Sequence, residues 1–243
     1  MHTKISPTKH PFDHLAPFES AWGRWWLLTR LRALRLAWSY ALNGSACIKR
    51  ALDLIGSLAA LVLLTPLFVL IIIVIRCEDR GPSIFTQIRV GRHGRLFKIY
   101  KFRSMHRDAE ARLQCLLAAN HHCNGVTFKL KNDPRVTCVG RWIRKLSLDE
   151  FPQFFNVLIG DMSLVGPRPP IPREVNRYTL ADRRRLAAQP GITCIWQVSG
   201  RAEIDFPQQV DLDVQYIENQ CLWLDLRILA KTLPAVIFGG GAY

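Results

Sequence analysis

Two adjacent carboxylates, Asp149 and Glu150, are the residues of this 243-residue sequence with the clearest potential for chemistry. Three cations, Arg141, Arg144 and Lys145, lie shortly before them. An ionised carboxylate among cations can act as a nucleophile toward a phosphorus centre whose charge has been neutralised. Two neighbouring acids also suit Mg²⁺, which is commonly held by one or two carboxylates plus substrate phosphate oxygens. The pattern therefore indicates chemistry on a phosphate group.

The same residues also allow a purely structural interpretation. Ser147, followed three residues later by Glu150, fits a capping box at the start of a helix, with Pro152 tolerated in the first turn. Spacing alone favours this helix cap. However, a helix start would also place Asp149 where the helix dipole favours an ionised carboxylate. The two interpretations are compatible with each other.

A second candidate is Arg168, which is enclosed by Pro167 and Pro169. Flanking prolines restrict the backbone, so the planar five-donor guanidinium is presented at little ordering cost and matches the geometry of a phosphate. A proline-rich surface turn with a solvated arginine is the favoured alternative for this motif alone. Asp161 in isolation is better explained as a turn residue. Further lone cations are ambiguous in the same way: Lys101, Arg103 and Arg201.

Several short elements must position these residues. Two β-prone stretches, Ser83 to Val90 and Leu96 to Phe102, surround a glycine-bounded turn and predict a hairpin. Proline and glycine interrupt the chain from Gly160 to Pro172. Composition and periodicity predict helices over residues 106–119, 141–145, 150–159, 182–188, 209–218 and 222–238. The last carries charges and a proline, so we expect it to dock on the surface or lie on a membrane.

The 22 residues from Leu54 to Ile75 carry no charge and predict a membrane segment. As a helix they would cover about 33 Å, enough for a bilayer core. Thr65-Pro66 lies near the middle, where proline bends a helix and the threonine hydroxyl can take a freed carbonyl. Basic residues flank both ends, which favours a re-entrant hairpin with both ends inside over a single span.

Composition limits the remaining choices. The chain has 33 Lys plus Arg against 19 Asp plus Glu, a net charge of +14, and 49% hydrophobic residues, so a disordered chain is excluded. Seven scattered cysteines without a Cys-x-x-Cys pair favour free thiols in a reducing cytoplasm. The basic charge suits phosphorylated substrates, anionic membrane lipid or nucleic acid. No nucleic-acid-binding motif is recognisable, so no nucleic acid partner is expected.

Six motifs occur in order along the chain: Lys49–Asp53, Lys101–Met105, Asp133–Thr137, Arg144–Gln153, Gly160–Pro169 and Trp196–Arg201. Together they resemble those of one family, the bacterial sugar transferases, also described as monotopic polyprenyl-phosphate phosphoglycosyl transferases. The resemblance covers roughly Lys49 to Tyr243, and the short chain is most similar to the small enzymes that start exopolysaccharide repeat units.

The resemblance implies transfer of a hexose-1-phosphate, of galactose or glucose, from a UDP-sugar to undecaprenyl phosphate, with UMP released and Mg²⁺ as cofactor. It further implies that Asp149 forms a phosphosugar-aspartyl intermediate and that Glu150 holds the metal. Arg168 would contact the nucleotide or diphosphate. Weaker candidates for phosphate contact are Lys101, Arg103, Arg144 and Arg201. The kink at Thr65 and Pro66 would correspond to the family's re-entrant helix.

We therefore expect a small membrane-associated α/β domain with a re-entrant or single-span membrane helix and interfacial amphipathic helices. Its parts would be a flexible tail (1–20), a basic Trp/Arg amphipathic segment (21–48), the membrane helix (49–76) and a cytoplasmic transferase domain (77–243). The expected location is the cytoplasmic face of a bacterial inner membrane. A non-catalytic membrane scaffold or regulator of the same fold is the alternative. A homo-oligomer is compatible with the sequence, which does not determine the oligomeric state.

Overall fold

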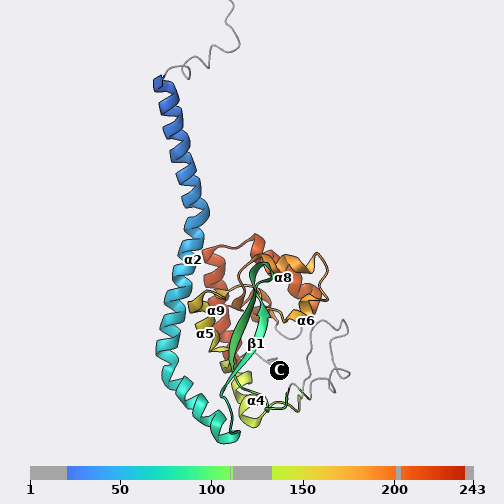
Figure 1. Ribbon diagram of the computed structural model, residues 1–243. Helices are drawn as coiled ribbons and strands as arrows, with labels where there is room; N and C mark the ends of the chain where they lie inside the picture. Colours follow the sequence, from blue (N-terminus) through green and yellow to red (C-terminus); the bar gives the residue numbers. More distant parts are fainter. Residues whose placement is uncertain (1–20, 110, 112–132, 201–203, 239–243) are drawn as a thin grey trace, which may run out of the picture. The chain divides into compact units, whose positions relative to one another are not determined.

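A computed structural model describes residues 21–109, 111, 133–200 and 204–238. The chain divides into two compact units, Met1–Ile48 and Lys49–Tyr243. The described part of the first unit is a stretch of helix α2 (Ala21–Glu78), which continues into the second unit. The second unit combines short helices and strands after this long helix (Figure 1), which confirms the expected α/β class.

Helix α2 contains the predicted membrane segment. Its part from Gly44 to Glu78 has a mean hydropathy of 3.2, and only 11% of the most apolar window is buried. Large apolar side chains such as Val62, Leu63 and Leu70 are exposed along it. Exposed apolar surface on this scale is typical of a segment that contacts lipid. Among the residues that the structure describes, no other helix is both long and apolar enough to cross a membrane.

Pro66 lies inside α2, and the helix continues through it to Glu78. The Thr65 hydroxyl donates a hydrogen bond to the Leu61 carbonyl at 2.7 Å. Pro66 frees a different carbonyl, that of Val62, because proline lacks the amide that would reach four residues back. The hydroxyl therefore reinforces the turn before the proline and does not replace the lost bond, contrary to the expectation from the sequence.

The predicted hairpin is confirmed as β1 (Ile84–Val90) and β2 (Leu96–Phe102), joined through the 3₁₀ turn η2 (Arg92–Gly94). The strands are antiparallel, and Arg89 lies opposite Phe97. One face buries Phe97 and Ile99 against Val157 and Met162. On the other face, Phe102 packs with a cluster that includes residues of α2. The hairpin therefore packs against α2 on one face and against the segment that contains Val157 and Met162 on the other.

A second sheet, which the sequence did not predict, pairs β3 (Ser163–Val165) with β4 (Gly191–Thr193) in parallel. The two backbones approach so closely that a Cβ atom on Gly191 would lie 2.1 Å from the Gly166 nitrogen. The Gly166 amide donates to the Thr193 carbonyl, and the Gly191 amide donates to the Pro167 carbonyl. Only glycine permits this spacing, because any side chain would collide with backbone atoms.

The remaining elements are helical. Those near the carboxylates are α4 (Cys138–Lys145), the 3₁₀ helix η4 (Leu148–Glu150) and α5 (Gln153–Ile159). They are followed by α6 (Pro172–Val175), the 3₁₀ helix η5 (Asp182–Ala187), α7 (Ile195–Ser199), α8 (Phe206–Glu218) and α9 (Leu222–Phe238). The predictions for 141–145, 150–159, 182–188, 209–218 and 222–238 each correspond to one of these elements. Most of the predicted helix 106–119 lies outside the described residues.

The capping box predicted at Ser147 is wrong. Ser147 has left-handed backbone angles, with φ of 54°, and its side chain makes no cap hydrogen bond. The three residues after it form η4, and α5 begins only at Gln153 after Pro152. Proline lacks an amide and fits a helix start, so the chain makes a tight turn at the carboxylates and becomes α-helical after them. The carboxylates therefore precede the α-helix and do not cap it.

Candidate active site

Asp149 and Glu150 both lie close to the same cation, Lys101, which the end of strand β2 supplies. The Lys101 ammonium lies 2.6 Å from Glu150 Oε1 and 3.9 Å from Asp149 Oδ2. The side chains are largely shielded, with exposed fractions of 16% for Lys101, 13% for Asp149 and 20% for Glu150. Phe97, Ile99 and Lys101 are every second residue of β2, so their side chains lie on the same face of the strand. Lys101 therefore continues the buried face toward the carboxylates. The site thus brings together three of the residues predicted from sequence.

The two carboxylates differ in their protonation behaviour. Burial raises the pKa of Asp149, the charge of Lys101 opposes that rise, and Glu150 adds to it, so the net shift is upward. Burial alone would also raise the pKa of Glu150, but Lys101 and Arg168 outweigh it and hold that pKa well below its usual range. Two close carboxylates resist joint ionisation. Glu150 is therefore the anion that the surrounding cations stabilise, and Asp149 is the acid that they leave more easily protonated.

Positive charge near Asp149 comes from side chains and not from a helix dipole. The sequence suggested that a helix dipole would keep the carboxylate ionised, but Asp149 lies in the three-residue η4 and not at an α-helix start. Nearby positive charge remains, because Lys101, Arg144 and Arg168 each lower the pKa of Asp149. Burial together with the charge of Glu150 outweighs these cations, so the pKa of Asp149 is raised. Additional positive charge at the site would favour the ionised, nucleophilic form.

Arg168 lies in a loop that is held from both sides. The Val90 amide of β1 donates to the Pro170 carbonyl at 2.9 Å, and the Gly191 amide of β4 donates to the Pro167 carbonyl at 2.9 Å. Pro167, Pro169 and Pro170 are buried, whereas Arg168 is half-buried. The alternative of a solvated surface turn is therefore wrong. The loop presents Arg168 from a fixed backbone.

Sequence reasoning missed Arg89, which lines a narrow pocket together with Lys101, Glu150 and Arg168. Its guanidinium donates to the Pro169 carbonyl at 3.0 Å. Burial and the charge of Arg168 lower the pKa of Arg89 to about 10. The hairpin register contained the signal, because Arg89 pairs with Phe97 and so shares a face with Lys101. Gln153 and Gln197 also line this pocket and were not singled out from the sequence.

The other predicted cations have different positions. Arg103 is buried against the end of α2, where it donates to the Asp79 carbonyl at 2.7 Å and lies 3.4 Å from the Asp79 carboxylate. It does not line the pocket with Lys101, so its assignment to phosphate contact is not supported. Arg144 is close enough to lower the pKa of Asp149. Arg201 lies outside the described residues. Asp161 follows Gly160, the left-handed residue after α5, as expected for a turn residue.

The residues at this site fit a magnesium ion. Glu150 is held as an anion by surrounding cations and offers carboxylate oxygens, the donor type that Mg²⁺ prefers. Asp149 adds a second carboxylate, and both carboxylates lie within 3.9 Å of the Lys101 ammonium. No group of three or more His, Cys, Asp or Glu residues suited to a metal occurs among the described residues. A carboxylate pair is nevertheless sufficient where substrate phosphate oxygens complete the shell.

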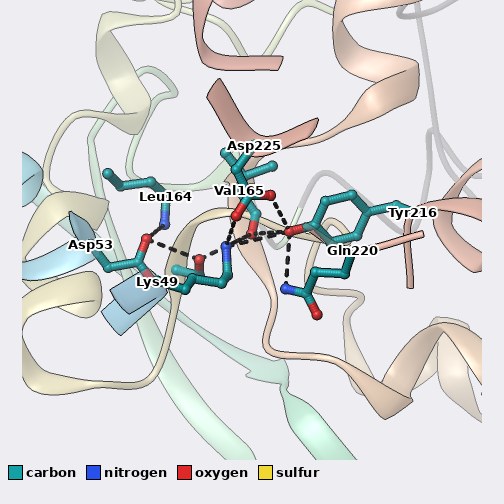
Figure 2. Close-up of polar contacts among 8 residues, drawn as sticks. Lys49, Asp53, Leu164, Val165, Tyr216, Gln220 and Asp225 are labelled. Carbon is teal, nitrogen blue, oxygen red and sulfur yellow. Dashed lines mark hydrogen bonds and ion pairs between the residues drawn. The ribbon is translucent and has the colours of Figure 1, made fainter. Parts of the chain in front are cut away.

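The charged side chains of the motif Lys49–Asp53 form hydrogen bonds within the second unit. Lys49 and Asp53 take part in a polar network with β3, α8 and α9 (Figure 2). Arg50 donates to the Val157 and Leu158 carbonyls at the end of α5, at 2.7 and 3.0 Å. These three side chains therefore fasten α2 to the domain.

Comparison with known proteins identifies relatives of the whole domain. The chain is 50% identical to the galactosyl transferase CpsE of Streptococcus agalactiae over 80% of this chain and 43% of the relative. It is 46% identical to the undecaprenyl-phosphate galactose phosphotransferase of Salmonella typhimurium over 86% of this chain and 44% of the relative. The chain thus spans less than half of the length of these two proteins.

A shorter relative is matched over most of its length. The exopolysaccharide production protein ExoY of Rhizobium meliloti is 41% identical over 80% of this chain and 88% of the relative. The family model described as bacterial sugar transferase matches residues 44–239, which include the hairpin, both carboxylates and the Arg168 loop. The chain therefore belongs to the bacterial sugar transferase family.

Proposed function

We propose that the protein transfers a hexose-1-phosphate, of galactose or glucose, from a UDP-sugar to undecaprenyl phosphate and releases UMP. The reaction would be the first membrane step in making an exopolysaccharide repeat unit. The names of the Salmonella and Rhizobium relatives support this lipid carrier and this process. The undecaprenyl-phosphate glucose phosphotransferase of Komagataeibacter xylinus, 41% identical over 80% of this chain, supports glucose as the second candidate sugar.

One observation carries the proposal: Glu150 and three cations from separate elements line one pocket, and the second carboxylate lies next to it. Glu150, Lys101, Arg89 and Arg168 line it, and Asp149 lies beside Lys101. A nucleotide sugar carries two linked phosphates, whose negative charge would be balanced by the lysine and the two arginines. A potential nucleophile therefore lies next to a pocket whose cations would stabilise the charge of a diphosphate.

In the first step, an Asp149 oxygen attacks the sugar-linked phosphorus. A bond forms between that oxygen and phosphorus, the bond to the bridging oxygen breaks, and UMP leaves with the electron pair. Arg168 and Arg89 would hold the phosphates and stabilise the charge that moves onto the leaving group. Lys101 would neutralise charge near the attacking carboxylate.

In the second step, a phosphate oxygen of undecaprenyl phosphate attacks the same phosphorus. The bond between phosphorus and Asp149 breaks, and the carboxylate is regenerated. Glu150 and substrate phosphate oxygens would hold Mg²⁺, which when bound supplies positive charge that lowers the pKa of nearby groups. Because burial raises the pKa of Asp149, such charge would favour its ionised form.

Membrane attachment fits a substrate whose long hydrocarbon chain stays in lipid. α2 exposes apolar side chains, while α4 and α9 expose the tryptophans Trp142 and Trp223. Exposed tryptophan suits the headgroup region of a bilayer. Lys145 lies over the Trp142 ring at 5.7 Å, so a cation accompanies the aromatic side chain there. We place the active site at the cytoplasmic surface of the inner membrane.

UMP release tests the reaction directly. Purified protein in detergent is mixed with undecaprenyl phosphate, Mg²⁺ and a panel of UDP-sugars. We expect release with one sugar and a loss of about 10³-fold or more in Asp149→Asn, because the amide cannot replace the nucleophile. A protein quenched without lipid acceptor should carry the hexose-phosphate on the peptide that contains Asp149.

Asp211→Asn is the matched control, because Asp211 is exposed on α8. It should retain wild-type turnover. Near-normal turnover in Asp149→Asn would contradict the covalent mechanism. If folded wild-type protein releases no UMP with any UDP-sugar, the non-catalytic membrane scaffold becomes the preferred function.

A further inference from the structure

The membrane helix meets strand β3 at a buried polar cluster in the second unit (Figure 2). Lys49, near the start of the apolar part of α2, lies 2.6 Å from Asp225 Oδ2 of α9. The same ammonium donates to the Val165 carbonyl of β3 at 3.1 Å. The Tyr216 hydroxyl of α8 lies 2.7 Å from Asp225 Oδ1 and 3.0 Å from the Val165 carbonyl. We call Lys49, Tyr216, Asp225 and the Val165 carbonyl the Lys49 clamp.

The clamp satisfies its polar groups almost completely. The three protons of Lys49 have three acceptors, Asp225, the Val165 carbonyl and, at 3.4 Å, the Tyr216 hydroxyl. Tyr216 is about 1% exposed and also accepts from the Gln220 amide. Burial raises the pKa of Tyr216, so its hydroxyl remains a donor. A buried network in which each member has partners specifies one geometry.

Asp53, one helical turn after Lys49, holds the neighbouring residues of the same strand. Its Oδ1 accepts from the Leu164 amide at 2.9 Å and from the Ser163 hydroxyl at 3.1 Å. Both contacts and the Lys49 bond to Val165 therefore bind α2 to successive residues of β3. The membrane helix therefore fixes the position of this strand together with the pairing of β3 to β4.

Val165 lies three residues before Arg168, and little flexibility separates them. The Gly166 amide is bonded to Thr193, the Pro167 carbonyl is bonded to Gly191, and the prolines fix the backbone on both sides of Arg168. A displacement of the Val165 carbonyl would therefore move the guanidinium. A shift of about 1 Å in a positioning group can cost about 10²-fold in function.

We propose that the Lys49 clamp is a positioning element of the active site: it holds the Val165 carbonyl and so sets the place of Arg168 in the pocket. Lys49, Tyr216 and Asp225 act through Arg168 and do not contact the substrate. The clamp also fastens the pocket to the helix that attaches the domain to lipid. This inference rests on the proposed role of Arg168 in binding the UDP-sugar.

The test separates positioning from stability. Lys49→Met should lower the melting temperature, because Asp225 remains buried without its cation, and should weaken Mg²⁺-dependent UDP binding about tenfold. The double variant Lys49→Met/Asp225→Leu removes both charges and should recover most of the melting temperature. Its UDP affinity should stay reduced, since the Val165 carbonyl still lacks the ammonium. Calorimetry measures UDP binding without requiring turnover.

Arg50→Met is the matched control, because it removes the neighbouring charge from the same helix but releases only the α5 carbonyls. It should destabilise the protein with less than about a twofold change in UDP affinity. Recovery of UDP affinity together with stability in the double variant would overturn the clamp, as would equal weakening in Arg50→Met. Tyr216→Phe, which keeps the ring, should give a smaller loss of UDP affinity than Lys49→Met. Unchanged UDP affinity in both Tyr216→Phe and the double variant would also overturn the clamp.

Wild-type protein that fails to bind UDP would overturn the proposed function and, with it, the clamp. If the wild-type protein binds UDP and all clamp variants bind it with the same affinity, only the clamp is overturned. The two failures are therefore distinguishable in one set of measurements.

Discussion

At the scale of single residues, the candidate active site contains two acids with different protonation behaviour. Asp149 and Glu150 are neighbours in sequence and share Lys101, yet burial raises the pKa of one while cations depress the pKa of the other. Pairs of titratable groups whose environments separate their pKa values commonly have different roles. This asymmetry agrees with Asp149 as the group that reacts and Glu150 as the anion that holds positive charge.

The asymmetry predicts opposite effects on stability. A carboxyl with a raised pKa in the folded state costs stability as pH rises above its unfolded pKa, so Asp149→Asn should raise the melting temperature near neutral pH. The gain should disappear below about pH 4, where the aspartate is protonated in both states. Thermal unfolding at several pH values checks this, and a neutral-pH loss of stability would contradict the raised pKa.

The same reasoning gives the reverse result for Glu150→Gln. A depressed pKa in the folded state contributes stability above the unfolded pKa, and this is lost as pH falls through the folded pKa. Glu150→Gln should therefore lower stability at neutral pH by about 1–3 kcal/mol, because the amide oxygen can still accept from Lys101 but carries no negative charge. An increase in melting temperature for this variant would show that Lys101 does not stabilise the anion.

At the scale of elements, the β3–β4 pair determines where the Arg168 loop can lie. The strands are short, and their backbones touch at Gly166 and Gly191. Close backbone approach allows the Gly191 amide to bond to the Pro167 carbonyl, next to Arg168. The site therefore depends on two glycines that contain no functional group of their own.

We predict that Gly191→Ala destabilises the protein by about 3 kcal/mol or more, because its Cβ would collide with backbone that cannot move aside. Gly44→Ala in α2 is the control, since nothing lies within 4 Å of its added Cβ. There, alanine should stabilise the helix by about 0.5–1 kcal/mol. Thermal unfolding measures both, and a harmless Gly191→Ala would contradict the close approach.

At the scale of the whole molecule, the main open prediction is the membrane topology. α2 continues through Pro66, and its exposed apolar surface is long enough to cross a bilayer. Basic residues at both flanks still predict that both ends remain in the cytoplasm. Cys47 and Cys77 are exposed free thiols near the two ends of the apolar segment.

Thiol labelling in intact cells tests this topology. In variants that keep only Cys47 or only Cys77, a membrane-impermeant reagent should label neither, because a re-entrant segment leaves both inside. Both should react after the cells are made permeable, which controls for accessibility. Labelling of either cysteine from outside would show that the segment spans the membrane.

The sequence by itself was sufficient to predict the hairpin, the apolar segment, most helices and the carboxylates with Arg168. Alternation, uncharged length and ordered motifs are local properties, and they do not require knowledge of distant contacts. The sequence did not indicate the β3–β4 pair, because two three-residue strands far apart in the chain have no periodic signal. It also predicted a cap at Ser147, where the tertiary fold selected a tight turn.

Only the tertiary structure decided which cations belong to the site. Arg103 and Lys101 are two residues apart, yet one binds Asp79 and the other meets the carboxylates. Arg89 entered the pocket through strand register, and Lys49 reached Asp225 across 176 residues of sequence. Residue type limits what a charge can do, but its partner depends on which segments pack together, and packing is determined by contacts across the whole chain.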